Sequence, residues 1–269
     1  VTKITNLPVQ DDEGRLYYTV RVDTDAGIHG LGEVGISNWG RAIANAVDHL
    51  GELVIGADPW DTEKLWQEMF RSGYFPADKV YCCAISAIDI ALWDIKGKSV
   101  NLPTYKLLGG QVREKVVCYP HIKGTDKQQI VDGSKRAVDE GWKFVRWGQP
   151  DPWGSFEPGG ISIIEPDKSM RLAVELMGEV REAVGPDIQM CFDVHTQLEL
   201  PQVVQMCKLM EEFNPFFIED PVRSENQGSY RNLRRQVNLP IAAGEQWSSK
   251  WPFREVIEED MIDDARIDL

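Results

Sequence analysis

The sequence lacks the features that mark membrane-spanning, exported or nucleic-acid-binding proteins. No apolar run approaches the roughly 18–20 residues that a membrane-spanning helix needs, and no basic segment with an apolar stretch opens the chain as in a signal peptide. Basic residues are scarce, because 29 Lys and Arg stand against 43 Asp and Glu, for a formal net charge of −14. Such an acidic surface repels phosphate groups, so we expect no nucleic-acid partner and no membrane.

Cysteine is also scarce. The five cysteines are odd in number and form no CxxC pair, which argues against both a disulfide framework and a zinc cluster. We expect reduced, mostly buried thiols in a cytoplasmic protein. What remains is ordinary for a globular protein: 269 residues, 42% hydrophobic and 27% charged, enough for one or two domains with a sizeable core.

Residues 1–112 carry the pattern of a small α+β domain. Segments 16–22 and 28–34 alternate apolar and polar residues on either side of a turn at 25–27, which predicts an antiparallel hairpin. Helical periodicity follows at about 40–54, 60–71 and 80–98. The Gly-Gly pair at 109–110 makes a natural linker, so we place the domain boundary near residue 112.

Residues 113–269 alternate between strand and helix patterns. We expect strands at 115–121, 143–147, 188–194, 216–218, 241–243 and 265–269, and helices at about 126–140, 167–184, 200–212, 226–236 and 250–258. This alternation indicates an α/β domain with a parallel sheet covered by helices. A closed eight-stranded (β/α) barrel needs two strands more than these six. We therefore expect an incomplete barrel here, and a natural chain that continues past residue 269.

Three of the predicted strands end in an acid. Asp193, Glu219 and Glu245 follow one another at intervals of 26 residues, about the length of one βα unit. Equal steps would place them at equivalent positions at the carboxyl ends of neighbouring strands, where barrel enzymes hold their active sites. Three converging carboxylates repel one another unless a cation lies between them. An all-oxygen ligand set of this kind suits Mg²⁺.

A histidine lies beside the first of these acids. His195 is two residues after Asp193, and positions i and i+2 of an extended strand share a face. The imidazole should therefore stand next to the predicted metal site, where it could move protons near neutral pH.

Several motifs resemble the enolase superfamily, in its mandelate racemase/muconate lactonizing branch. They are the helix segment 84–97 (AISAIDIALWDIKG) and the strand ends 192–195 (FDVH), 217–221 (FIEDP) and 243–246 (AGEQ). The resemblance covers essentially the whole chain and implies an enolase-type barrel with an N-terminal capping domain. It implies that Asp193, Glu219 and Glu245 bind one Mg²⁺ per active site, with Glu245 also near the substrate. In this family a base removes the proton α to a carboxylate, and the metal stabilises the resulting enediolate.

Within that branch, the Asp-x-His arrangement is similar to dehydratases of mannonate, gluconate and galactonate. The resemblance implies that His195 is a general acid that helps a hydroxyl leave, and that Arg146 acts where racemases carry a Lys-x-Lys pair. It also implies substrate contacts by Asn38 and His121. Asp268 takes the place of the aspartate that supports a second histidine, the general base, which we expect beyond residue 269.

The leading hypothesis is thus a hydro-lyase that converts a hexonate to a 2-keto-3-deoxy acid. A racemase or epimerase of the same superfamily remains an alternative. So does a catalytically silent metal-binding regulator or relic, because Arg146 replaces the lysines and the insertion at 148–160 has no tyrosine. Asn38 and His121 also have ordinary structural uses in turns and at strand ends. By analogy with other capped barrels, we expect a homo-oligomer.

Overall fold

The computed structural model describes residues 1–12, 14, 16–36, 39–148 and 165–268. The described chain forms two compact units: the cap unit, Val1–Lys115 together with Asp268, and the barrel unit, Val116–Ile267. We expected the boundary near residue 112, and the division falls after Lys115. In the part of the chain that is described, no helix has the length and apolar character needed to cross a membrane.

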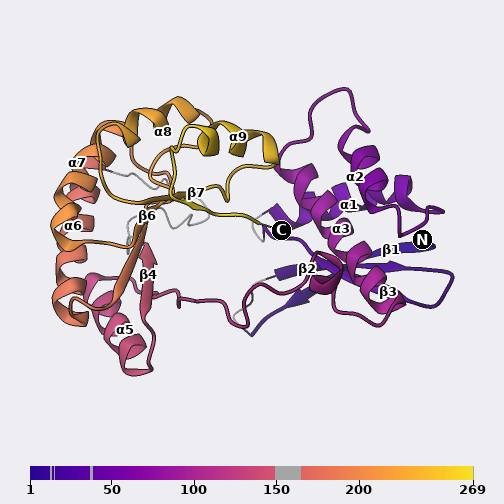
Figure 1. Cartoon of the computed structure of the whole chain (residues 1–269), viewed down its shortest axis with the longest axis horizontal. Helices are drawn as coiled ribbons and strands as arrows, with labels where there is room; N and C mark the ends of the chain where they lie inside the picture. The colour runs from indigo at the N-terminus through magenta and orange to yellow at the C-terminus, as the bar shows by residue number, and fades with distance from the viewer. Residues whose placement is uncertain (13, 15, 37–38, 149–164, 269) are drawn as a thin grey trace. The chain divides into compact units, whose positions relative to one another are not determined.

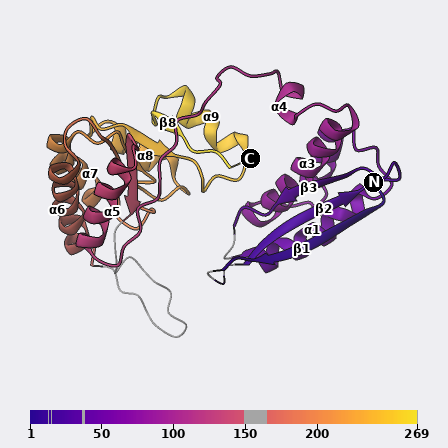
Figure 2. The same cartoon turned by 90° about the horizontal axis from the view of Figure 1, so that it is seen from below.

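The cap unit is an antiparallel sheet covered by helices (Figures 1 and 2). The sheet has the order β1-β2-β3, formed by β1 (Lys3–Gln10), β2 (Leu16–Asp23) and β3 (His29–Glu33). The helices are α1 (Gly40–Val54), α2 (Thr62–Phe70), α3 (Lys79–Ser99) and the short α4 (Thr104–Leu107). The predicted hairpin and three predicted helices are confirmed, whereas β1 was not predicted.

The apolar periodicity of α3 explains why this helix forms the centre of the cap core. Ala84, Ile88 and Leu92 recur at four-residue steps and are fully buried. They belong to one core cluster with Val20 and Val22, the inward-facing residues of β2. The helix thus buries one face against the sheet.

Two glycines let α3 approach β3 unusually closely. A Cβ atom added to Gly30 would lie 1.9 Å from the carbonyl oxygen of Ala91, and one added to Gly32 would lie 1.9 Å from that of Ala87. No side chain fits in such a space, so glycine is required here by close packing of strand and helix.

The barrel unit contains a parallel sheet of order β4-β5-β6-β7-β8, with one helix after each of the first four strands (Figure 1). The strands are β4 (Phe144–Gly148), β5 (Gln189–Asp193), β6 (Phe217–Glu219), β7 (Ile241–Ala243) and β8 (Asp264–Ala265). The helices are α5 (Lys127–Asp139), α6 (Pro166–Val184), α7 (Leu200–Met210), α8 (Gln227–Arg234) and α9 (Lys250–Glu258), with a 3-10 turn at Glu211–Phe213. All five predicted helices are confirmed.

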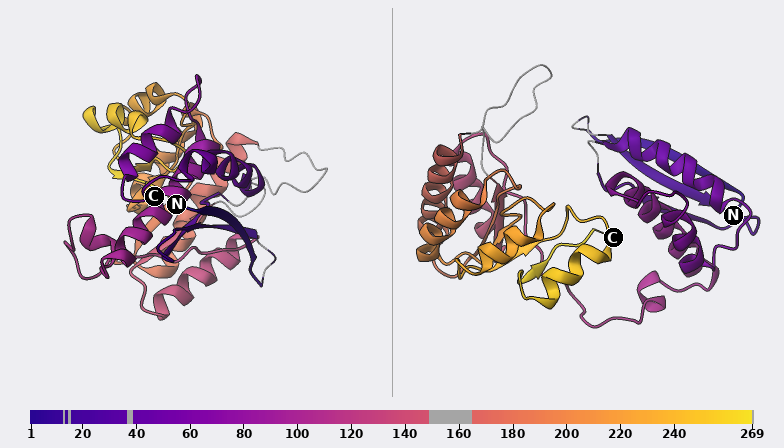
Figure 3. Two further views of the ribbon diagram at one scale, coloured as in Figure 1. Left: turned by 90° about the vertical axis from the view of Figure 1, so that its right-hand side faces the viewer. Right: turned by 90° about the horizontal axis from the view of Figure 1, so that it is seen from above.

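The two faces of this sheet differ in character. Alternate residues such as Val145, Phe192 and Ile218 point toward the helices and are fully buried in the main core. Helices α6 and α7 lie along that outer side in Figures 1 and 3. The opposite face carries a small apolar cluster around Cys191 and Phe217. The polar site begins on this inner face, at the carboxyl ends of the strands.

Arg181 connects the segments that precede β5 and β6, at the amino ends of these two strands. Arg181, near the end of α6, donates hydrogen bonds to the carbonyl oxygens of Gly185, Ile188, Phe213 and Asn214 at 2.7–3.0 Å. These carbonyls lie in the segments that lead into β5 and β6. The two strands that end in Asp193 and Glu219 are therefore held in register from their amino ends.

Two predicted strands differ in the structure. Residues 115–121 were predicted as a strand, but only His121 pairs within the described chain, through an isolated bridge to Arg146, and Val116 and Val117 are exposed. The last strand ends at Ala265, so Asp268 follows it rather than lying on it. The described sheet of the barrel unit therefore has five strands instead of six. A strand forms only where a partner backbone is in register, which an apolar pattern alone does not reveal.

Candidate active site

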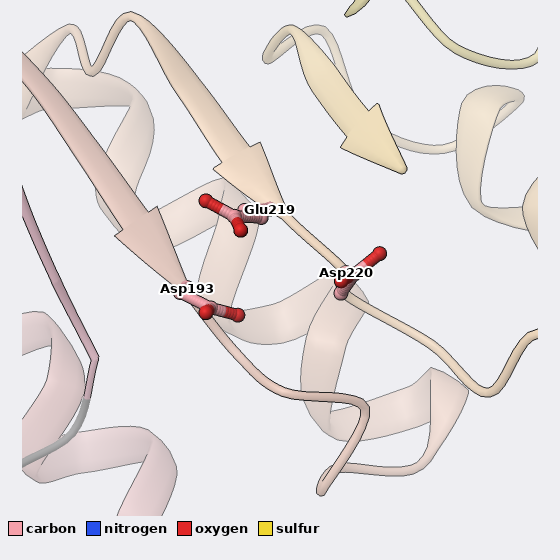
Figure 4. Close-up of side chains that lie close together, drawn as sticks. All are labelled: Asp193, Glu219 and Asp220. Atoms are coloured by element: carbon pink, nitrogen blue, oxygen red, sulfur yellow. The ribbon is translucent and has the colours of Figure 1, made fainter. Parts of the chain in front are cut away.

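Three buried carboxylates meet at the carboxyl ends of β5 and β6 (Figure 4). Asp193 is the last residue of β5, Glu219 is the last of β6, and Asp220 follows directly. One oxygen from each lies within 4.8 Å of the others, and no residue of the three is more than 2% exposed. Carboxylates this close and this dry repel one another, so their charge must be offset by nearby cations.

Strand register explains why the first two acids converge. Asp193 and Glu219 are direct pairing partners, and the backbone N–H of Val194 donates to the carbonyl of Glu219 at 2.9 Å. On the next strand, Glu219 pairs with Ala242, only 23 residues later. Glu245 therefore lies beyond the end of β7, because this βα unit is three residues shorter than the spacing suggested. The expected equivalence of positions is confirmed for the first two acids and wrong for Glu245.

Asp220 was not predicted as part of the site. Neighbouring residues of a strand normally point to opposite faces, but the left-handed φ of 41° at Asp220 breaks this alternation just after Glu219. His195 and Thr196 also have positive φ, of 52° and 55°. Such conformations are uncommon outside glycine and concentrate at functional sites. The adjacent Glu-Asp pair was the signal in the sequence that could have identified Asp220.

Arg146 on β4 is the central cation of the site. Its Nε and Nη2 donate to the two oxygens of Glu219 at 3.0 and 2.8 Å, and Nη2 also contacts Asp193 Oδ2. Its third edge, Nη1, lies 3.0 Å from Nδ1 of His121. Arg146 is only 6% exposed. The guanidinium holds both acids by the forked geometry that suits carboxylates.

A second guanidinium, that of Arg266, was also not predicted. It follows β8 directly and contacts Glu219, donates to Glu245 Oε2 at 3.0 Å, and lies 3.2 Å from the Tyr119 hydroxyl. Arg266 lies inside the segment predicted as the last strand, 265–269, so the sequence did not mark it as a residue at the carboxyl edge. Arg266 thereby joins Glu245 to the carboxylate cluster.

Burial and charge act strongly on the carboxyl groups. Burial raises the pKa of Asp220 to about 7, and the negative charge of Glu245 adds to the rise. Its Oδ2 atom is buried without a hydrogen-bond partner in the described chain. Burial also raises the pKa of Glu219, although the hydrogen bond from Arg146 opposes that rise. A cation bound here would favour the ionised forms of these carboxyl groups, because an opposite charge nearby lowers a carboxyl pKa.

The structure brings His195 to the cluster. Its Nε2 lies 2.5 Å from Asp193 Oδ2, and its backbone N–H donates to Asp193 Oδ1 at 2.8 Å. The hydrogen bond with Asp193 raises the pKa of His195. The expected neighbourhood is confirmed, but its reason was wrong. The strand ends at Asp193, and a left-handed turn rather than an extended backbone places the imidazole.

The remaining predicted site residues, His121, Asp268 and Asn38, do not all lie at the carboxylate cluster in the described chain. His121 lies beside Arg146, at the edge of the cluster. Asp268 belongs to the cap unit, where its Oδ2 lies 3.4 Å from Lys79 Nζ. Asn38 and the insertion from residue 149 onward lie outside the described residues. The structure therefore gathers Asp193, Glu219 and His195 with Arg146.

The donor chemistry of the cluster fits a hard divalent cation. Every candidate ligand is a carboxylate oxygen, the combination that Mg²⁺ favours. The buried oxygen of Asp220 that lacks a partner supports the same conclusion, since a buried polar atom is normally satisfied by a hydrogen bond or an ion. A cation held here would lie next to the imidazole of His195, a group that can give up or take a proton near neutral pH.

Known protein families match most of the chain. Residues 6–109 match the family model of the mandelate racemase/muconate lactonizing enzyme N-terminal domain, and residues 129–269 match that of the enolase C-terminal domain-like family. The chain is 32% identical to the D-galactonate dehydratase family member RspA of Cellvibrio japonicus, over 94% of this chain and 67% of that protein. It is 34% identical to the D-galactonate dehydratase of Pectobacterium atrosepticum, over 96% and 65%. It thus spans about two thirds of these relatives' length.

Solved structures show the same architecture. An enolase from Pantoea ananatis with bound D-gluconate and Mg superposes with a TM-score of 0.89 at 27% identity, over 98% of this chain and 70% of that one. A member of the enolase superfamily from Salmonella Typhimurium superposes with a TM-score of 0.90 at 29% identity, over 100% and 73%. Since both domain models match in order, the chain belongs to the mandelate racemase/muconate lactonizing branch of the enolase superfamily.

Proposed function

We propose that this chain carries the magnesium site of a hydro-lyase that converts a six-carbon sugar acid to a 2-keto-3-deoxy acid. The observation that carries the proposal is the buried all-oxygen cluster of Asp193, Glu219 and Asp220, with His195 against it. Relatives named D-galactonate dehydratase, and a similar structure with bound D-gluconate and Mg, support the choice of substrate class.

Asp193 and Glu219 would hold the metal, with Glu245 as the third ligand. Bound Mg²⁺ supplies the positive charge that makes a proton α to a carboxylate removable. Glu245 is linked to the cluster through Arg266 and is 35% exposed, so it can turn toward an ion with little rearrangement. Asp220, which is buried next to Glu219, would offer the ion a further carboxylate oxygen.

His195 would donate a proton to the departing hydroxyl group. Its hydrogen bond with Asp193 favours the charged imidazolium, which is the form that can give up a proton. The side chain is about half exposed, so one edge of the ring remains open to a ligand. Arg146 keeps Asp193 and Glu219 in place, and Asn38 and His121 would contact the substrate. Asp268 would support a general base.

The first test is a product assay. The protein in its natural full length is incubated with Mg²⁺ and a panel of hexonates, and any 2-keto acid is trapped as its semicarbazone. A trapped 2-keto product supports dehydration. Inversion of a substrate centre without a 2-keto product would instead identify a racemase or epimerase. Mg²⁺ binding without either reaction would identify a silent metal-binding protein.

The role of His195 is tested by His195→Asn, which we expect to lower kcat by about 10²–10⁴-fold, the usual contribution of a positioned acid. His49→Asn, in the cap unit, is the matched control. Unchanged turnover in His195→Asn would remove this residue from the reaction.

The ligand set is tested by calorimetric titration of Mg²⁺ into Glu245→Gln. We expect a clearly weaker affinity, whereas the exposed Glu225→Gln should bind as the parent protein does. An unaltered affinity in Glu245→Gln would exclude Glu245 as a ligand. The same titration of Asp220→Asn then shows whether Asp220 takes its place.

A further inference from the structure

We infer that Arg146 holds His121 as a neutral imidazole with its proton on Nε2, so that His121 donates a hydrogen bond to a ligand oxygen and cannot act as a base. The protonation pattern follows from geometry alone. The identity of the ligand, a sugar acid, rests on the proposed function.

The backbone fixes the two residues side by side. His121 and Arg146 form a parallel bridge, and the N–H of Ile122 donates to the carbonyl of Arg146 at 2.8 Å. Residues paired in this way project their side chains on the same side of the sheet. The backbone bridge between His121 and Arg146 therefore places the imidazole next to the guanidinium. Side-chain rotamers elsewhere in the protein do not change this placement.

The hydrogen bond between them can have only one direction. Nη1 of Arg146 lies 3.0 Å from Nδ1 of His121. A guanidinium has no acceptor atom, so the ring nitrogen that faces it must accept. A neutral imidazole whose Nδ1 accepts carries its proton on Nε2. A doubly protonated ring would place one N–H against another, and a flipped ring would turn a carbon toward Arg146.

The donor itself cannot move away easily. Nε and Nη2 of Arg146 are committed to Glu219 at 3.0 and 2.8 Å, and the side chain is buried. Only Nη1 remains for His121. Rotation of the guanidinium toward another partner would leave the buried carboxylate of Glu219 without this charged partner, which is strongly unfavourable.

The electrostatic surroundings favour the same neutral state. Burial lowers the pKa of His121, and the positive charges of Arg146 and Arg266 lower it further. Lys123 acts in the same direction, and Asp193 is the one charge named here that opposes it. Burial and the cations together outweigh Asp193.

Two chemical consequences follow for the ligand. His121 is exposed and offers an N–H donor, which pairs with a carboxylate or hydroxyl oxygen and not with an ammonium group. The single lone pair of the neutral ring is already used by Arg146. His121 therefore orients an oxygen of the sugar acid, while removal of the α proton must be done by another group.

Nitrogen NMR tests the protonation pattern directly. The chain has four histidines, so a ¹⁵N-histidine-labelled sample shows four imidazoles, and His121→Gln identifies the one in question. We expect a non-protonated Nδ1 and a protonated Nε2 at pH 7. A proton on Nδ1, or a doubly protonated ring at that pH, would overturn the inference.

Variants show whether Arg146 is the cause. Arg146→Lys keeps one charge but cannot hold Glu219 and His121 together, so we expect a mixture of the two neutral forms. Arg266→Lys, which changes a nearby cation without a bond to His121, should leave the pattern intact. If both variants retain the parent pattern, Arg146 does not set it. If Arg146→Lys fails to fold, the spectrum of the parent protein still decides.

Binding of D-gluconate in the presence of Mg²⁺ tests the role toward the ligand. We expect His121→Phe to weaken binding about tenfold or more, as loss of a hydrogen bond to a charged group does, and His121→Gln, which retains an N–H donor, to weaken it less. Equal loss in both variants would overturn the donor role. A protein that shows the expected NMR pattern but neither binds nor dehydrates hexonates would refute the proposed function alone.

Discussion

Each unit buries one basic side chain, but the contacting groups differ: they are neutral around Lys96 in the cap unit and charged around Arg146 in the barrel unit. In the cap unit, Lys96 is 7% exposed, and its Nζ donates to the neutral hydroxyl of Thr62 at 2.8 Å. The same Nζ lies 4.6 Å and 5.5 Å from the ring centroids of Trp93 and Trp60. In the barrel unit, Arg146 is 6% exposed, and its partners are charged carboxylates.

We interpret the difference as follows: Lys96 stabilises the fold of the cap unit, whereas Arg146 belongs to the candidate active site. A hydroxyl and two indole faces stabilise the ammonium without adding charge, and burial raises the pKa of the nearby Asp89 carboxyl group, which disfavours its charged form. The carboxylates of the cluster outnumber its two arginines, because Asp193, Glu219 and Asp220 are buried together and, in the described chain, only Arg146 and Arg266 contact them as guanidinium groups. An excess of buried charge can be relieved only by an ion, a proton or a ligand. The comparison therefore predicts larger effects in the barrel unit than in the cap unit.

The largest effect should come from Glu219→Gln. This change leaves Arg146 buried without its forked carboxylate partner, and broken buried pairs typically cost about 3–5 kcal/mol. Urea denaturation of the metal-free protein measures the free energy of unfolding. The exposed Glu225→Gln, which breaks a surface pair with Arg223, should have little effect. A loss below about 1 kcal/mol for Glu219→Gln would contradict the proposed importance of the pair.

A smaller effect is expected for Lys96→Met. The substitution removes one hydrogen bond to Thr62 and the cation–π contacts with the two tryptophans, but its apolar end suits the same pocket. We expect a loss of about 2 kcal/mol in the same denaturation experiment. Lys64→Met, at an exposed position of α2, is the control. A loss as large as that of Glu219→Gln would remove the distinction between the two units.

The smallest effect depends on pH. Burial raises the pKa of Asp89, on α3, from 3.8 to about 6, while the charge of Lys96 opposes the rise. A raised carboxyl pKa means that ionisation costs stability in the folded state. That cost is absent below the unfolded pKa and is fully present above the folded one.

Asp89→Asn should therefore stabilise the protein at pH 8 and have no effect near pH 4. The full shift corresponds to about 3 kcal/mol, which solvent screening of this partly exposed group reduces to about 1–2 kcal/mol. Thermal or urea unfolding at both pH values measures the difference, with the exposed Asp25→Asn as control. If Asp89→Asn instead lowered the free energy of unfolding at pH 8, the attraction between Asp89 and Lys96 would outweigh the cost of burying the Asp89 charge.

Helices and ligand strands could be predicted because their signals are local. The buried stripe of α3 repeats every three to four residues, and the apolar strands before Asp193 and Glu219 are short, buried and followed by acids. Both patterns need only neighbouring residues to be recognised. The α/β class of the barrel unit follows from information of this kind, whereas the enolase-type fold and the family came from the resemblance of motifs such as 192–195 and 217–221.

Tertiary structure alone decided which groups meet. Arg266 is 47 residues from Glu219, and only the placement of β8 beside β7 brings it to the site. Asp220 enters the cluster through one backbone dihedral, and Glu245 leaves the expected register through one shorter βα unit. The physical reason is the same in each case. Residue identity and periodicity are carried by the chain locally, whereas contact between side chains depends on pairing register and backbone conformation, which the whole fold determines.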